Sequence, residues 1–313
     1  AATELLLRLF LGPLAPPVQV HSDAGDPGSW LVEERGRVRT AYQKNPVGFP
    51  AEPRAPRIAV LGGSSVHAGN PRLQLHEEFP SLLGEELGMQ SLNLGRPAID
   101  SHDVRRILEE LSAYEFAAWV VYTGHNDFGN TYFFQRYKDW SSPFRITMDA
   151  RLKSLQLYWL LKGTIGPRAN SLREGLGWEN FQGSVDRVQL GYALQHLEMN
   201  LRRIIWLSQS SGTPLVLVVP AGCQTTSEKG SCRPLGNCLA GASCARKDYD
   251  LGMRMVGSDP SGARKYLDSA LDTDTVPLRI PTYAQDLVRE LAEESGTVLV
   301  DAPLLLPREE GVD

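Results

Sequence analysis

Five short apolar runs constrain the fold of this chain more than any other feature. They have the length and the β-branched content of buried strands, and none alternates polar with apolar residues, as expected when both faces of a parallel sheet are covered. They are Arg57 to Leu61, Gln90 to Leu94, Ala117 to Tyr122, Pro214 to Val219 and Thr297 to Val300. Helical patterns lie between them, at Glu77 to Leu87, His102 to Tyr114, Gln189 to Gln209 and Tyr283 to Ser295. This order predicts an α/β fold, a three-layer α/β/α sandwich around a five-stranded parallel sheet.

Two long segments interrupt this alternation, and we interpret them as insertions into one domain. Residues 128–187 are rich in aromatic side chains and follow the Gly124 to Asp127 motif directly. We expect them to wall the active site, although the same aromatics could pack a small core of their own. Residues 221–281 contain a short helix candidate at 263–272, and we expect them to form a cap. The chain therefore divides into an N-terminal segment, 1–56, and a single domain, 57–313.

All four cysteines fall in one Gly/Ser-rich stretch of the second insertion. They are Cys223, Cys232, Cys238 and Cys244. Two disulfides would each stabilise the fold by roughly 2 to 4 kcal/mol and would indicate an oxidising, extracytoplasmic compartment. The alternative is a four-cysteine zinc site, but its usual C-x2-C pairs are absent and no histidine is near. Disulfides are the favoured interpretation, and three pairings remain open.

Charge and the N-terminal sequence bear on the partners of the chain. A formal net charge of -5 provides no basic field for a phosphate backbone, which disfavours nucleic acid as a partner. The apolar stretch from Glu4 to Leu11 is shorter than the about 20 residues that span a bilayer. Our hypothesis is that a signal anchor precedes it and provides membrane association, and the alternative is a helix that packs on the core.

Candidate catalytic residues follow the first three predicted strands, whose carboxyl ends should meet at one edge of the sheet. A serine hydroxyl becomes a nucleophile when a base takes its proton and donors stabilise the oxyanion. We predict Ser64 as the nucleophile, with its own N–H, the Gly95 N–H and the Asn126 carboxamide as oxyanion donors. A plain turn at Ser64, an Asx turn from Asn93 to Gly95 and a helix cap at Asn126 are the structural alternatives. Residues expected to contact substrate are Gly63, Ser65, His67, His125 and Asp127.

These motifs resemble the blocks of the SGNH or GDSL-type serine hydrolases, over about residues 57–127. Gly62-Gly63-Ser64 resembles the nucleophile block, Gly95 the oxyanion glycine, and Gly124-His125-Asn126-Asp127 the Gly-x-Asn-Asp block. The sequences at 60–65, 121–128 and 271–274 resemble most a bacterial envelope branch, often membrane-anchored and sometimes carrying tetratricopeptide repeats, which this chain lacks. The resemblance implies a flavodoxin-like hydrolase fold that needs no metal and no cofactor. Gly63 stands where the wider family has an aspartate that is not the triad acid.

The general base is the part of the family pattern that this sequence does not contain. The family carries it in an Asp-x-x-His motif after the last strand, and none of the six histidines here lies there. We therefore expect the Asp-x-x-His pair beyond residue 313. Asp301 is interpreted as a cap of the turn after the last strand. His67 and His125 lie near the predicted site and are the alternative bases.

The function that follows is an extracytoplasmic serine esterase. Its substrate would be an acylated small molecule, carbohydrate or lipid, and acyl transfer to a sugar uses the same chemistry. The alternative from another class is a non-catalytic envelope scaffold or carbohydrate-binding subunit with envelope protein partners. A nucleotide-binding domain is disfavoured, because no G-x-G-x-x-G or G-x-x-x-x-G-K motif opens a helix.

Overall fold

A five-stranded parallel sheet forms the centre of the computed structural model, which describes residues 30–41, 47–53, 55–67, 78–133, 185–221 and 245–305. Its strands are β4 (Arg57–Gly62), β5 (Gln90–Asn93), β6 (Ala118–Tyr122), β7 (Leu215–Val219) and β8 (Val298–Asp301). All five predicted strands are confirmed. The spatial order is β5-β4-β6-β7-β8, with every neighbouring pair parallel. β4, the first strand of this sheet along the chain, thus lies between β5 and β6. The winding therefore reverses between β4 and β6, as in flavodoxin-like folds.

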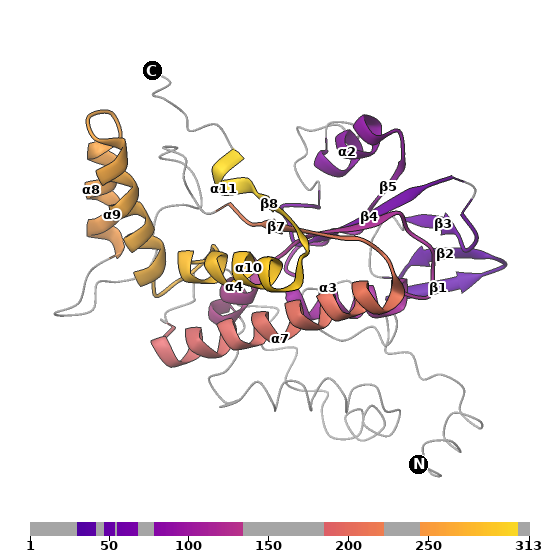
Figure 1. Cartoon of the computed structure of the whole chain (residues 1–313). Helices are drawn as coiled ribbons and strands as arrows, with labels where there is room; N and C mark the ends of the chain where they lie inside the picture. Colours follow the sequence, from indigo (N-terminus) through magenta and orange to yellow (C-terminus); the bar gives the residue numbers. More distant parts are fainter. Residues whose placement is uncertain are drawn as a thin grey trace, which may run out of the picture.

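Helices cover both faces of the sheet, which confirms the three-layer prediction. The four predicted helices are α2 (Phe79–Leu87), α3 (Ser101–Leu111), α7 (Arg187–Ser211) and α10 (Thr282–Ser295). Figure 1 shows α3, α7 and α10 on one face and α2 on the other. The larger core lies under α3, α7 and α10 and includes the fully buried Trp119. A smaller cluster on the α2 face contains Val60 and Val120.

The N-terminal segment contributes an antiparallel meander that the sequence analysis did not predict. Its strands are β1 (Leu31–Glu34), β2 (Arg37–Thr40) and β3 (Gly48–Pro50). Arg35 and Gly36 join the first two strands with φ angles of 53° and 72°, the type I′ geometry of a two-residue hairpin. Val38 and Phe49 are fully buried in the main core. This part of the N-terminal segment is therefore packed on the domain.

Four further helices complete the described structure. α8 (Ala245–Met255) and α9 (Pro260–Thr273) form a helical hairpin in the second insertion, and α9 confirms the helix predicted at 263–272. α4 (His125–Phe133) begins directly after β6, and the short α11 (Ala302–Leu305) follows β8. None of the helices in the described ranges combines the length and the apolar character needed to cross a bilayer. The four cysteines and residues 134–184 of the first insertion lie outside the described residues.

Candidate active site

A pocket lies at the point where the winding of the sheet reverses. β4 and β6 pair in parallel up to Gly62 and Tyr122, and ligands of such sheets bind outside these carboxyl ends. The pocket has a volume of about 220 Å³, including its open mouth. Its lining residues are Gly63, Ser64, Ser65, Ile99, Tyr122, Thr123, Gly124, His125 and Asn126. The structure thus brings together five of the predicted site residues from two strand ends.

Ser64 stands on a single helical turn after β4. The backbone N–H groups of Val66 and His67 both donate to the Gly63 carbonyl, at 3.1 and 3.0 Å. The Ser64 side chain is exposed, and its hydroxyl makes no hydrogen bond within the described part of the chain. The turn therefore presents an accessible hydroxyl at the carboxyl end of the sheet. The backbone N–H groups at the start of this helical turn lack intrahelical partners and are also available to a bound group.

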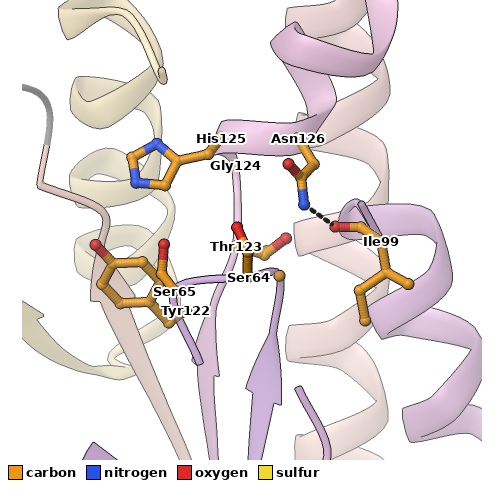
Figure 2. Close-up of a pocket in the computed structure, with 9 residues that line it drawn as sticks. Ser64, Ser65, Ile99, Tyr122, Thr123, Gly124, His125 and Asn126 are labelled. Carbon is orange, nitrogen blue, oxygen red and sulfur yellow. Dashed lines mark hydrogen bonds between the residues drawn. The ribbon is translucent and has the colours of Figure 1, made fainter. Parts of the chain in front are cut away.

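Asn126 lies above this turn at the start of α4 (Figure 2). Its Nδ2 donates to the Ile99 carbonyl at 2.7 Å. A carboxamide nitrogen carries two hydrogens, so the second remains for a group bound in the pocket. A Cβ atom on Gly63 would collide with this same Nδ2. Glycine at position 63 thus has a steric reason, because the Asn126 carboxamide occupies the space of a side chain.

Gly95 lies against the Ser64 turn but does not line the pocket. Its N–H donates to Asn93 Oδ1 at 3.0 Å, which is the Asx turn left open by the sequence. Asn93 Nδ2 in turn donates to the Val66 carbonyl and to Glu78 Oε2, both at 3.0 Å. His67 Nδ1 lies 3.2 Å from the Gly95 carbonyl oxygen, also outside the pocket lining. These bonds fix the Ser64 turn from the β5 side.

Asp127 is buried outside the pocket, with 2% of its surface exposed. Its carboxylate accepts from the Ser101 backbone N–H at 3.1 Å and from the Ser101 hydroxyl. Asn200 Nδ2 donates to the same Ser101 hydroxyl oxygen at 2.9 Å. Asp127 therefore ties the start of α4 to α3 and α7, and it positions the turn that carries Asn126 rather than facing the pocket itself.

His125 lines the pocket as a neutral ring. The Ile280 backbone N–H donates to His125 Nδ1 at 3.1 Å. Burial, and after it the positive charge of Arg279, lowers the pKa of His125 to about 3. A neutral imidazole that accepts at Nδ1 carries its proton on Nε2. His125 is thus an N–H donor to the pocket, and in this state it cannot accept the proton of Ser64.

The carboxyl end of β8 is held by an ion pair rather than by a turn cap alone. Asp301 accepts from Arg289 Nε at 2.7 Å and from Arg289 Nη2 at 3.2 Å. The pair joins β8 to α10 and orients the chain that continues into α11. Across the described ranges, no three His, Cys, Asp or Glu side chains gather closely enough to hold a metal ion.

The chain is weakly similar to several solved esterase structures. No protein family model and no curated protein matches it. A lipolytic protein of the G-D-S-L family from Desulfitobacterium hafniense is 10% identical, with 82% of each chain covered and a TM-score of 0.37. A catalytic mutant of Axe2, an acetylxylan esterase from Geobacillus stearothermophilus, is 15% identical, with 80% of this chain and 77% of that chain covered and a TM-score of 0.36. Esterase EstA from Pseudoalteromonas sp. is 12% identical, with 78% and 76% covered and a TM-score of 0.34. These similarities are too low to assign a function, and the strand order itself defines the α/β fold.

Proposed function

We propose that this chain is an SGNH-type serine acyl hydrolase in which Ser64 attacks the carbonyl carbon of an ester. The observation that carries the proposal is the shared pocket of an exposed, unbonded Ser64 hydroxyl and an Asn126 carboxamide anchored on Ile99. A donor fixed before the reaction stabilises the oxyanion without reorganising, and one such donor contributes roughly 100-fold to 1000-fold to kcat.

The reaction runs in two steps. The Ser64 oxygen bonds to the carbonyl carbon while a base takes its proton, and the oxyanion lies beside Asn126 Nδ2 and the Ser64 N–H. Collapse of this intermediate expels the alcohol, which takes a proton from the protonated base, and water then releases the acyl group in the same way. Gly95 can join as a third donor only by sharing the N–H that now bonds Asn93 Oδ1.

The base in this proposal is the histidine of an Asp-x-x-His segment beyond residue 313, as the family resemblance implies. Two observations support it. β8 runs parallel to β7, so its carboxyl end faces the same sheet edge as Ser64. His125 is neutral and bonded at Nδ1, which removes it as the base. An extracytoplasmic location, paired cysteines and membrane association belong to the same proposal.

The test compares two neighbouring serines of one turn. Ser64→Ala should abolish hydrolysis of 4-nitrophenyl acetate and covalent labelling by a fluorophosphonate, both measured on the full-length protein. Ser65→Ala is the matched control, because Ser65 is also exposed and lines the same pocket; it should keep the label. Labelling that survives in Ser64→Ala would contradict the proposal. A folded wild-type protein that neither labels nor hydrolyses would favour the non-catalytic envelope subunit.

A further inference from the structure

The pocket has a second polar side that the proposed acyl chemistry does not use. Figure 2 shows Asn126 on one side of Ser64, and Ser65, Tyr122 and His125 grouped on the other. These three side chains come from the turn after β4, the end of β6 and the start of α4. An ester bound with its carbonyl oxygen toward Asn126 has its alcohol part free to extend toward this second side.

The second side offers hydrogen-bond donors. The Tyr122 hydroxyl oxygen accepts from the Ala221 backbone N–H at 3.2 Å, and the same hydroxyl is hydrogen-bonded to Ser65. One bond between two hydroxyls uses one hydrogen, so the pair keeps a second hydrogen to donate to a bound group, and the phenol can supply it. Burial raises the pKa of Tyr122, so this hydrogen is retained at neutral pH. His125 adds its Nε2–H, since Nδ1 is bonded to Ile280. Among the described residues that line the pocket, none is acidic.

A fixed segment places a positive charge behind these donors. The segment 278–281 leads into α10, where Thr282 donates from its N–H and its hydroxyl to the Asp272 carboxylate, at 2.7 and 2.6 Å. Its Ile280 packs on the β6–α4 turn so closely that a Cβ on Gly124 would lie 2.6 Å from Ile280 Cδ1. Arg279 is therefore held next to the pocket wall.

The charge of Arg279 reaches both donors. Its side chain is half-buried, and its Nη1 donates to the Leu278 carbonyl at 3.0 Å within the same segment. The positive charge of Arg279 acts to lower the pKa of Tyr122 and of His125, although burial is the larger influence on both. A negative group bound by Tyr122 and His125 would be stabilised by the same field.

We propose that Ser65, Tyr122 and His125, backed by Arg279, form a subsite for an anionic group on the alcohol part of the ester substrate. This inference rests on the proposed function of Ser64. The neutral donors orient the anionic oxygens, and Arg279 supplies the attraction. The substrates of choice are thus esters of acidic alcohols, such as hydroxy acids or acidic sugars, rather than esters of neutral ones.

The kinetic test uses two acetyl esters that differ by one charge, 4-acetoxybenzoate and methyl 4-acetoxybenzoate. The quantity compared is the ratio of kcat/KM for the anionic ester to kcat/KM for the neutral ester, measured in Arg279→Gln and in the wild type. The intrinsic reactivities of the two esters are the same with both proteins, so they cancel in this comparison. We expect the preference for the anion to fall about tenfold, through loss of 4-acetoxybenzoate turnover alone, as for one charge in a partly solvated site. Arg246→Gln, at an exposed arginine of α8, is the matched control and should leave the ratio unchanged. An equal fall for both esters, or no change of ratio in Arg279→Gln, would overturn the subsite.

A binding measurement separates this inference from the proposed function. Calorimetry with Ser64→Ala protein should show that 4-hydroxybenzoate binds more tightly than methyl 4-hydroxybenzoate, and that Arg279→Gln removes the difference. If the wild type hydrolyses neither ester while this Arg279-dependent binding is present, the Ser64 function fails and the subsite stands. If the wild type hydrolyses both esters without a preference for charge, the subsite fails and the Ser64 function stands.

Discussion

Two asparagines one turn apart on α4 allow the oxyanion role to be separated from a structural role. Asn126 Nδ2 donates to the Ile99 carbonyl at 2.7 Å, and Asn130 Nδ2 donates to the Ala98 carbonyl at 2.9 Å. Both side chains therefore tie α4 to the same two-residue stretch. Only Asn126 lines the pocket, whereas Asn130 is buried at 2% exposure. Substitution of each by alanine removes one bond to a backbone carbonyl. Asn130→Ala also removes a longer bond to Asp100 Oδ2 at 3.4 Å, whereas Asn126→Ala also removes the proposed oxyanion donor.

The two variants should differ in which quantity falls most, the free energy of unfolding or kcat. Each loses a carboxamide–carbonyl bond worth about 0.5–1.5 kcal/mol, and the buried site of Asn130 adds the cost of unsatisfied partners, for a total of about 1–3 kcal/mol. Asn126→Ala should in addition raise the activation barrier by about 2.7–4 kcal/mol, a loss of 100-fold to 1000-fold in kcat. Asn130→Ala should thus unfold at lower urea concentration yet keep nearly the wild-type kcat.

Urea unfolding followed by circular dichroism, and kcat and KM for 4-nitrophenyl acetate, would measure both effects. A small change in stability with a large fall in kcat for Asn126→Ala is the result expected of an oxyanion donor. Equal kcat losses in the two variants, in proportion to their loss of stability, would refute the reasoning, because Asn126 would then act only as a tether. A rise in KM at constant kcat would also refute it, since the bond would serve substrate binding alone.

Further predictions follow from single contacts. Gly63→Ala should reduce kcat at least tenfold with little loss of stability, because the new Cβ displaces Asn126 Nδ2, and steady-state kinetics beside thermal melting would show this. His125 is neutral when folded down to about pH 3, while the unfolded chain protonates it near pH 6.5, so acid destabilises the fold. His125→Gln should remove up to about 1.4 kcal/mol per pH unit from the slope of the free energy of unfolding between pH 5 and 6; an unchanged slope would contradict the buried neutral ring. Arg57→Leu leaves the Glu115, Pro50 and Ala51 carbonyls without their cation, and a loss of at least about 3 kcal/mol is expected in urea unfolding.

The sequence predicted the central sheet well because buried parallel strands carry their own signal. Each needs a continuous apolar run, and each run stands out between helical patterns. α4 carries no such signal, since Asn126, Gly129 and Thr131 are poor helix formers. Its start is held instead by contacts with α3, such as the bonds between Asp127 and Ser101. Tertiary contacts therefore stabilise α4, a helix that local propensity would not predict.

The missed N-terminal hairpin is a different case, because its signal was present in the sequence. Arg35-Gly36 is a two-residue turn with glycine at its second position, and the following Arg37 to Thr40 alternates exposed with buried side chains. The pattern is short, and a four-residue alternation occurs by chance in many loops. What makes it a strand is its pairing with β1 and β3 and the buried Arg57, whose guanidinium bonds carbonyls on both sides of the junction.

At the candidate site, the local motif predicts the position of His125 but not its protonation state. Gly124-His125-Asn126-Asp127 correctly predicted that His125 and Asn126 line the pocket, whereas Asp127, expected to contact substrate, is buried against Ser101. It could not predict which atom of His125 carries the proton, since that depends on the N–H of Ile280, 155 residues later in the chain. The same ring with Nδ1–H donated to a carbonyl would have a free lone pair at Nε2 and could serve as a base. A single backbone bond from a distant segment thus makes His125 a donor. His67, whose Nδ1 lies 3.2 Å from the Gly95 carbonyl oxygen, can adopt the other arrangement, but it lies outside the pocket lining.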